Sequence, residues 1–597
     1  MPSMLRKWFP LLVLVLLLGA PRPAGSRENS GNFTPTLPVS AIQPGLKGVC
    51  YTSFEGDQIE RIDLEVIGVL HNAIGPQLDV ILVRLLGAKV EQTGVVAGMS
   101  GSPVYIDGKL AGALALKLGS FTKEAIGGVT PIADMLEIEQ SPPTPRSKSK
   151  TSASLQVPLP QEFAHNVAAG TGEFLVPIDT PLITSGVFPD TLARFGKEFS
   201  AWGMSAMAGG TAASSRNDFD LKPGDMVGID LIRGDLSISS GCTVTTVVEG
   251  RILACGHPLF GFGSIKMPLS RAHVLMTLAS ASASTKVITT GGTIGTLTED
   301  RQTAVMGKLG AGPPMIPLDV TLDTPAEQKK YHFEVIESPQ LTPTLVAAAA
   351  YNGIIASPAY GEGPMLQMDG EIGLKGHTPV QLEDLFVPVD PATPAAFYLA
   401  TEVQNAFSRI YSNPYELPQI DRIDLHVKNL TERRSAEIEG AWIERTVVHP
   451  GETLDVKVLL RPYRGEPFIQ AVPVSIPAQT ARGTLQLVIS DAEFLNRNVQ
   501  SLASTSQGQL TSLEQLIQLL NRERHNDRLY ATLLQPTPTV FVEDKEMPNV
   551  PASAISVLNQ RQTSDGARLL WQSTAGQWSV AMHQVITGQH MLTLTVK

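Results

Sequence analysis

The chain has 597 residues, and its 57 acidic and 46 basic residues give a formal net charge of −11. Such a chain lacks the basic face that nucleic acid requires, so nucleic acid is excluded as a partner. Its 44 prolines and 52 glycines, together with short runs of β-branched residues, predict a mainly β protein with many turns. Its length predicts about three or four domains.

The first predicted element is a secretory signal peptide over residues 1–25. Arg6 and Lys7 precede an apolar run over residues 8–20, and small residues such as Ala24 follow it. The run is short for a membrane span, which needs about 20 residues, although an uncleaved anchor is the alternative. We therefore expect an extracytoplasmic chain, periplasmic or secreted, with no stable transmembrane segment after the signal is removed.

The boundaries expected for the remaining chain follow changes in composition and periodicity. Residues 141–156 are polar, contain proline and have no periodicity, so they are expected to form a linker. The expected parts are a serine-bearing half over 26–140, a connecting region over 157–220, a histidine-bearing half over 221–325, a mixed α/β region over 326–420 with helices at 342–355 and 395–411, a β-sandwich over 421–495, and a helical and β region over 496–597 with a helix at 510–534 that Ser512 caps.

The most informative motif is Gly98-Met-Ser-Gly-Ser-Pro103, which a short hairpin with an Asp107-Gly108 turn follows. Its glycines allow backbone angles that other residues resist. The N–H groups of Gly98 and Ser100 are therefore expected to converge as an oxyanion hole, with Ser100 as the nucleophile. The alternatives are an ordinary Gly/Ser loop and Ser102 as the nucleophile.

A serine nucleophile needs a base, and His257 is the histidine that stands out among the 11 in the chain. A short apolar strand ends just before it and a glycine-rich loop follows, so small neighbours leave the imidazole accessible. The alternative is a structural histidine at the end of a strand. No metal motif accompanies it, because Cys50, Cys242 and Cys255 are widely spaced, and either one disulfide or three buried thiols fits them.

The serine and histidine blocks together resemble the sporulation protein IV B (SpoIVB) serine peptidase family over about residues 45–140 and 220–325. The resemblance rests on these segments: Gly98–Pro103, Ile62–Val66, Gly127–Pro131, Lys222–Asp225, Val247–His257 and Gly292–Thr296. It implies a trypsin-like double β-barrel peptidase in which Ser100 is the nucleophile and His257 the general base, without a metal or cofactor. The family has its histidine block first, so the order here is circularly permuted, which a triad defined by spatial roles allows.

The acid that would orient His257 is expected to be Asp79. This aspartate opens an apolar strand, as the catalytic aspartate of trypsin-like enzymes does, although it could equally solvate a strand end or cap a turn. Asp63 and Asp300 are the alternatives. A Ser–His pair without an acid also remains chemically competent, because the acid mainly fixes the imidazole tautomer and stabilises its charge.

Two functions follow from this pattern. The first is an exported serine endopeptidase that cleaves protein or peptide substrates through Ser100, His257 and Asp79. The alternative is a non-catalytic envelope protein that binds or scaffolds partners through a degenerate peptidase-like barrel. In both cases the C-terminal region is expected to contact an envelope protein partner.

Overall fold

A computed structural model describes most of the chain after residue 33. The described residues are 34–119, 124–140, 156–159, 174–208, 220–280, 282–357, 360, 365–390, 392–497, 512–536, 539–542, 545–548, 550, 551, 553, 568–570 and 573–597. The expected signal peptide, and the expected linker up to residue 155, lie outside them. In the described part, no helix is long and apolar enough to cross a membrane.

The chain is mainly β, as its sequence predicts, and it begins with a closed six-stranded barrel. In barrel order the strands are β4 (Pro103–Ile106), β1 (Lys47–Ser53), β2 (Ile59–Gly75), β3 (Leu78–Leu86), β6 (Ile126–Pro131) and β5 (Lys109–Leu118), and β5 closes onto β4. Strand β2 shows why these segments form barrel strands: Ile62, Leu64 and Val66 are buried, while the residues between them face outward. The serine motif lies between α1 (Ala88–Thr93) and β4.

A second six-stranded ring carries the histidine. Its strands, in order, are β12 (Ser237–Val248), β13 (Arg251–Ala254), β16 (Ala304–Leu309), β15 (Thr285–Arg301), β14 (Gly263–Leu278) and β11 (Met226–Gly234), and β11 closes onto β12. Strands β9 (Thr180–Ser185) and β10 (Met204–Ala208) extend this sheet beside β12, and α4 (Pro189–Ala201) connects them. The double β-barrel expected from the sequence is therefore confirmed.

An α/β layer follows the second barrel. Its strands, in order from β11, are β18 (Gln328–Val335), β17 (Ile316–Asp323), β21 (Ile420–Leu430), β19 (Met365–Leu374) and β20 (Val380–Phe386). Helices α5 (Thr342–Ile355) and α6 (Ala395–Tyr411) pack on this sheet and have the bounds predicted from sequence. The small side chains of Ala347–Ala350 let the almost wholly buried α5 approach its neighbours closely.

The C-terminal body is a sandwich of two sheets around one apolar core. Its strands are β22 (Ser435–Trp442), β24 (Thr453–Pro462), β25 (Phe468–Ser475) and β32 (Val585–Thr587) in one sheet, and β23 (Val447–Val448), β33 (Gln589–Val596), β26 (Gly483–Ser490), β27 (Arg528–Gln535) and β31 (Ser573–Ala581) in the other. A smaller sheet contains β28 (Thr539–Val542), β29 (Lys545–Pro548) and β30 (Arg568–Leu570).

Two expected boundaries in this region are wrong. Strand β21, placed in the sandwich from sequence, pairs with β17 and β19 and belongs to the α/β layer, while strands after residue 573 complete the sandwich. The helix expected over 510–534 is only α8 (Leu513–Leu520), which Ser512 caps as predicted. Residues 528–535 form β27 instead, because Leu529 and Leu533 alternate into the sandwich core.

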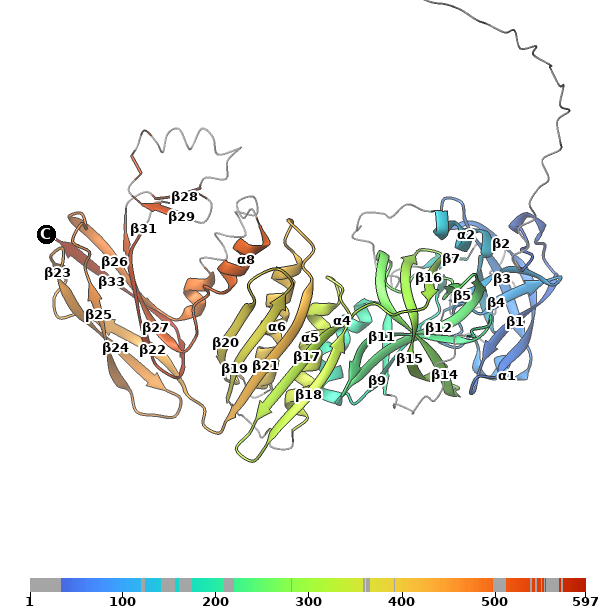
Figure 1. The fold of residues 1–597 in the computed structure, drawn as a ribbon, viewed down its shortest axis with the longest axis horizontal. Coiled ribbons are helices and arrows are strands. Elements are labelled where there is room, and N and C mark those ends of the chain that lie inside the picture. The colour runs from blue at the N-terminus through green and yellow to red at the C-terminus, as the bar shows by residue number, and fades with distance from the viewer. Residues whose placement is uncertain are drawn as a thin grey trace, which may run out of the picture.

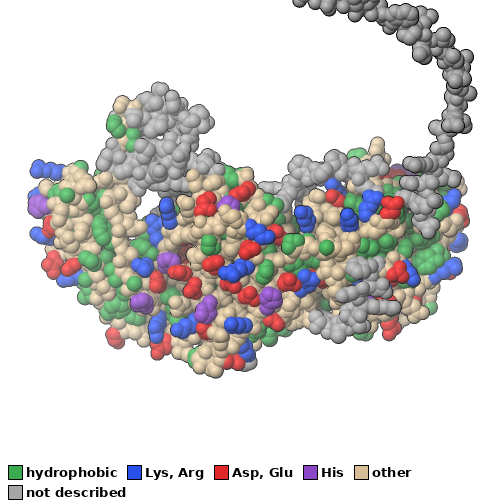
Figure 2. Space-filling view, in the orientation of Figure 1, with side chains coloured by type: hydrophobic (Ala, Val, Ile, Leu, Met, Phe, Trp, Pro, Cys, Tyr) green, Lys and Arg blue, Asp and Glu red, His purple; other side chains and the backbone are tan. Residues whose placement is uncertain are grey.

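The four bodies lie in a row (Figure 1), from the first barrel at one end to the sandwich at the other. The space-filling view shows acidic and basic side chains interspersed over the visible face (Figure 2). The two barrels contact each other directly, because backbone hydrogen bonds join Ser100 of the serine motif to β12, and Ala97, just before the motif, to β15. The candidate site lies at this contact.

Candidate active site

The serine loop is held in a shape that its glycines permit. Gly98 and Gly101 have φ values of +92° and +93°, in the left-handed region. A Cβ on Gly101 would lie 1.9 Å from the Thr243 carbonyl oxygen and 2.5 Å from the Cys255 backbone nitrogen. Only glycine therefore lets this loop approach the second barrel so closely.

Ser100 lies at the centre of that loop and is fully buried, with 0% of its surface exposed. Its Oγ has no hydrogen-bond partner among the described residues, and neither does its N–H. The other expected oxyanion donor, the Gly98 N–H, donates to the Asp179 carbonyl oxygen at 3.3 Å. Ser102, the rival nucleophile, donates its hydroxyl to the Met99 carbonyl at 2.6 Å.

The histidine loop is fixed from three sides. A disulfide joins Cys255, two residues before His257, to Cys242 on β12, which is the single-disulfide alternative left open by the sequence. The carboxylate of Asp300 accepts hydrogen bonds from four consecutive N–H groups after His257, those of residues 259–262. On the third side, Thr130 donates its hydroxyl to the Gly256 carbonyl at 2.6 Å.

The imidazole of His257 has the tautomer that a general base needs. Its Nδ1 lies 2.8 Å from the Pro258 carbonyl oxygen, which can only accept, so Nδ1 carries the proton. Its Nε2 is buried, has no hydrogen-bond partner among the described residues and keeps its lone pair. Burial lowers the pKa of His257, whereas the Pro258 carbonyl, Asp179 and the Ile178 carbonyl raise it.

Strand β12 brings the two loops together. The backbone N–H of Thr243 donates to the Ser100 carbonyl at 2.8 Å, and the Thr243 carbonyl accepts from the Cys255 N–H at 3.2 Å. The hydroxyls of Thr243 and Thr245 donate to the carbonyls of the two glycines of the motif, at 2.9 and 2.7 Å. No hydrogen bond joins Ser100 to His257, and both polar atoms are unpartnered where their loops meet.

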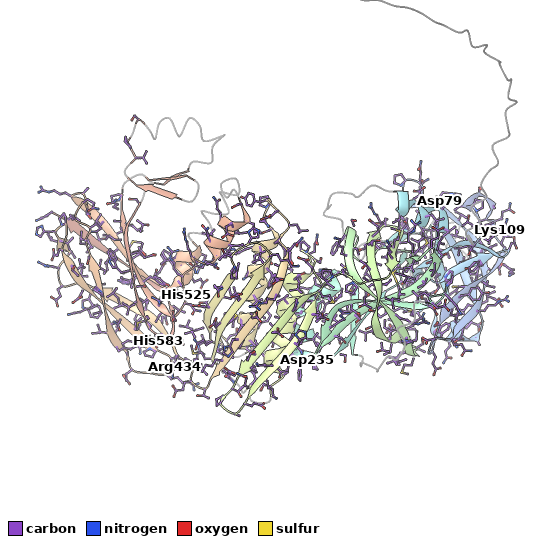
Figure 3. All side chains as sticks on the ribbon, in the orientation of Figure 1. Asp79, Lys109, Asp235, Arg434, His525 and His583 are labelled. Carbon is purple, nitrogen blue, oxygen red and sulfur yellow. A yellow bond between two sulfur atoms is a disulfide. The ribbon has the colours of Figure 1, made fainter. Side chains whose placement is uncertain are left out.

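The structure does not bring Asp79 to the imidazole. Its carboxylate accepts from the Asn72 N–H at 2.9 Å and lies 3.0 Å from Nδ1 of His71, so it joins the start of β3 to the end of β2, next to their turn. Figure 3 shows it on the first barrel. Asp63 pairs with Arg61 and its side chain is 63% exposed. The role expected of Asp79 is therefore not filled by any of the three acids weighed from sequence.

Two residues that sequence reasoning missed lie near the serine loop. Asp179 raises the pKa of His257 and pairs with Lys117, whose Nζ lies 2.5 Å from its carboxylate. Lys286 is fully buried against Gly98 and donates to the Thr52 hydroxyl at 2.7 Å. Burial lowers the pKa of Lys286 to about 7. A lone lysine among serines and threonines carries no sequence signal for such burial.

Comparison with known proteins adds no relative. No protein-family model matches the chain, and no curated protein matches it. Within the described residues, no group of three or more His, Cys, Asp and Glu side chains is arranged to hold a metal ion.

The disulfide gives a first prediction about this site. Replacing Cys242 and Cys255 with alanine should lower the local unfolding free energy of the second barrel by about 3 kcal/mol, because the bond closes a loop with a sequence separation of 13. Hydrogen exchange of the β12 and β13 amides measures this change. A reductant should reproduce the loss in the parent protein and do nothing to the double variant. Equal protection in parent and variant would contradict the prediction.

Proposed function

We propose that this protein is a serine endopeptidase that cleaves protein or peptide substrates, a permuted relative of the SpoIVB peptidases. One observation carries the proposal: an unpartnered serine hydroxyl and an unpartnered Nε2 of the correct tautomer are buried where two barrels meet. Buried polar groups are normally hydrogen-bonded, so two orphans at one junction favour a functional site over a structural one. The closed pair of barrels is the fold that this resemblance implies.

In the proposed reaction, Ser100 Oγ attacks the carbonyl carbon of the substrate and its proton passes to Nε2 of His257. His257 then returns the proton to the leaving amine, and water hydrolyses the acyl-serine by the same route. The free N–H of Ser100 donates to the oxyanion, and the Gly98 N–H joins it when the Asp179 carbonyl moves away. The Pro258 carbonyl orients the imidazole, the task for which a carboxylate was expected.

We further propose an extracytoplasmic location. The Cys242–Cys255 disulfide supports it, because such bonds persist in oxidising compartments and are rare in the cytosol. The amino-terminal pattern expected to be a signal peptide is consistent with the same location. An envelope protein is proposed as the partner of the C-terminal sandwich.

A fluorophosphonate probe tests the proposed activity. The probe reacts only with a serine that a base activates, whose Oγ displaces fluoride and forms a phosphonate ester, so slow labelling is expected in the parent protein and none in Ser100→Ala. Ser102→Ala is the matched control, since that hydroxyl is engaged with the Met99 carbonyl, and it should label at the parent rate. Labelling that persists in Ser100→Ala would remove the assignment.

One observation favours the alternative, a non-catalytic envelope binding or scaffold protein. Ser100 and His257 are 0% and 4% exposed, so a bulky substrate cannot reach them in this conformation. Under that alternative, none of the variants or the parent protein should react with the probe.

A further inference from the structure

A short segment of the chain lies on the first barrel as an added strand. Strand β8 (Phe174–Pro177) pairs antiparallel with β5, with Leu175, Val176 and Pro177 opposite Leu118, Lys117 and Leu116. The Ile178 N–H continues the ladder by donating to the Ala115 carbonyl at 2.9 Å. Strand β7 (Val157–Pro158) pairs with the other side of β8. The segment 174–179 therefore runs extended along β5 toward the serine loop.

The end of this segment meets the proposed catalytic groups. The Asp179 carbonyl accepts from Gly98 N–H, one of the two donors expected for the oxyanion. The Ile178 carbonyl and the Asp179 carboxylate both act on the imidazole of His257. A peptide substrate would also have to place a backbone carbonyl group at this position, because attack requires a carbonyl beside the serine, the base and the oxyanion donors.

The side chain of Ile178 shows what the site accepts. It is 1% exposed and belongs to the apolar core of the first barrel, together with Met99, Leu114 and Val96. An aliphatic, β-branched side chain of this segment is therefore buried in the same apolar core as Met99 of the serine motif. A polar or charged side chain there would lose its hydration without gaining a partner.

We propose that residues 174–179 are a built-in occupant of the substrate site, and that the external substrate is an extended polypeptide that displaces them. Its backbone adds to β5 as a strand, and it places an aliphatic side chain where Ile178 now lies. The inference rests on the proposed peptidase function. Because the occupant belongs to the same chain, its binding is intramolecular, so the site stays closed until a substrate competes for it.

The first test measures fluorophosphonate labelling of Ser100 in Ile178→Asp and in the milder Ile178→Ala. Both changes weaken the packing of residues 174–179 on the first barrel, so labelling should be at least about tenfold faster than in the parent. Ile469→Asp is the matched control, because it makes the same change on β25 of the C-terminal sandwich, where Ile469 is 56% exposed. It should label at the parent rate. Equal, measurable labelling rates in the parent and both Ile178 variants would overturn the inference and leave the proposed function intact.

A second measurement does not depend on catalysis. A fluorescent synthetic peptide of residues 174–180 is added to Ile178→Ala combined with Ser100→Ala, and binding is followed by fluorescence anisotropy. Saturable binding, and weaker binding of a peptide with aspartate at the Ile178 position, is the expected result. No binding of either peptide would overturn the inference. If the peptide binds here and Ser100 is not labelled in any protein of the first test, the occupied peptide site is retained and the peptidase is rejected.

Discussion

Replacing His257 with alanine is expected to slow acyl transfer at Ser100 by about 10⁴–10⁶-fold. The serine hydroxyl is then left without the group that takes its proton. The second-order rate of fluorophosphonate labelling, compared in an Ile178→Ala background, measures the loss. His71→Ala is the control, because His71 lies on β2 of the first barrel and contacts Asp79 instead of the serine loop. A rate within tenfold of the parent would show that His257 is not the base.

The pH dependence of the same rate follows from the surroundings of His257. Burial lowers the pKa of this imidazole below its ordinary 6.5, so the neutral form that accepts a proton persists in more acidic solution. The labelling rate should rise with pH through a midpoint below 6.5 and then remain level. Asp179→Asn removes a charge that raises the pKa and should move the midpoint further down. A midpoint above 6.5 in the parent would contradict this assignment.

Replacing the buried Lys286 with methionine is expected to raise the local unfolding free energy by about 4 kcal/mol at pH 7. Folding lowers the pKa of this lysine from 10.5 to about 7, so the folded chain must bury a charge or release a proton. Methionine fills a similar volume without that cost. Hydrogen exchange of the β1 and β15 amides reports the change, since a multidomain chain need not unfold in one step.

The direction in which stability changes with pH shows whether the methionine variant is stabilised by removal of the buried charge or by better packing. Between pH 7 and 9 the unfolded chain keeps the Lys286 proton that the folded chain has lost, so the parent becomes more stable as pH rises, by about 1.4 kcal/mol per pH unit. Below pH 7 both states hold the proton and the slope disappears. The methionine variant should lack the slope between pH 7 and 9. Lys109→Met, at the exposed hairpin labelled in Figure 3, should leave it unchanged.

The elements that the sequence pattern predicted correctly are those stabilised within one continuous segment of the chain. The helices over 342–355 and 395–411 were predictable because their length and apolar content suffice over one continuous segment. The helix expected over 510–534 failed because Leu529 and Leu533 also satisfy a two-residue period, and pairing of β27 with β26 decides between the two. Strand β21 was misplaced for the same reason, since its partners are distant in sequence.

The sequence by itself determined the two loops that carry the candidate chemistry, because glycines with positive φ and a strand end beside His257 are local properties of the chain. Only the tertiary structure decided what surrounds them. It assigned Asp79 to a turn, set Asp179 near the imidazole, buried Lys286 behind Gly98 and laid residues 174–179 along β5. The physical reason is that charge burial and strand addition depend on which surfaces come into contact in the folded chain. The spacing of residues along the sequence does not specify those contacts.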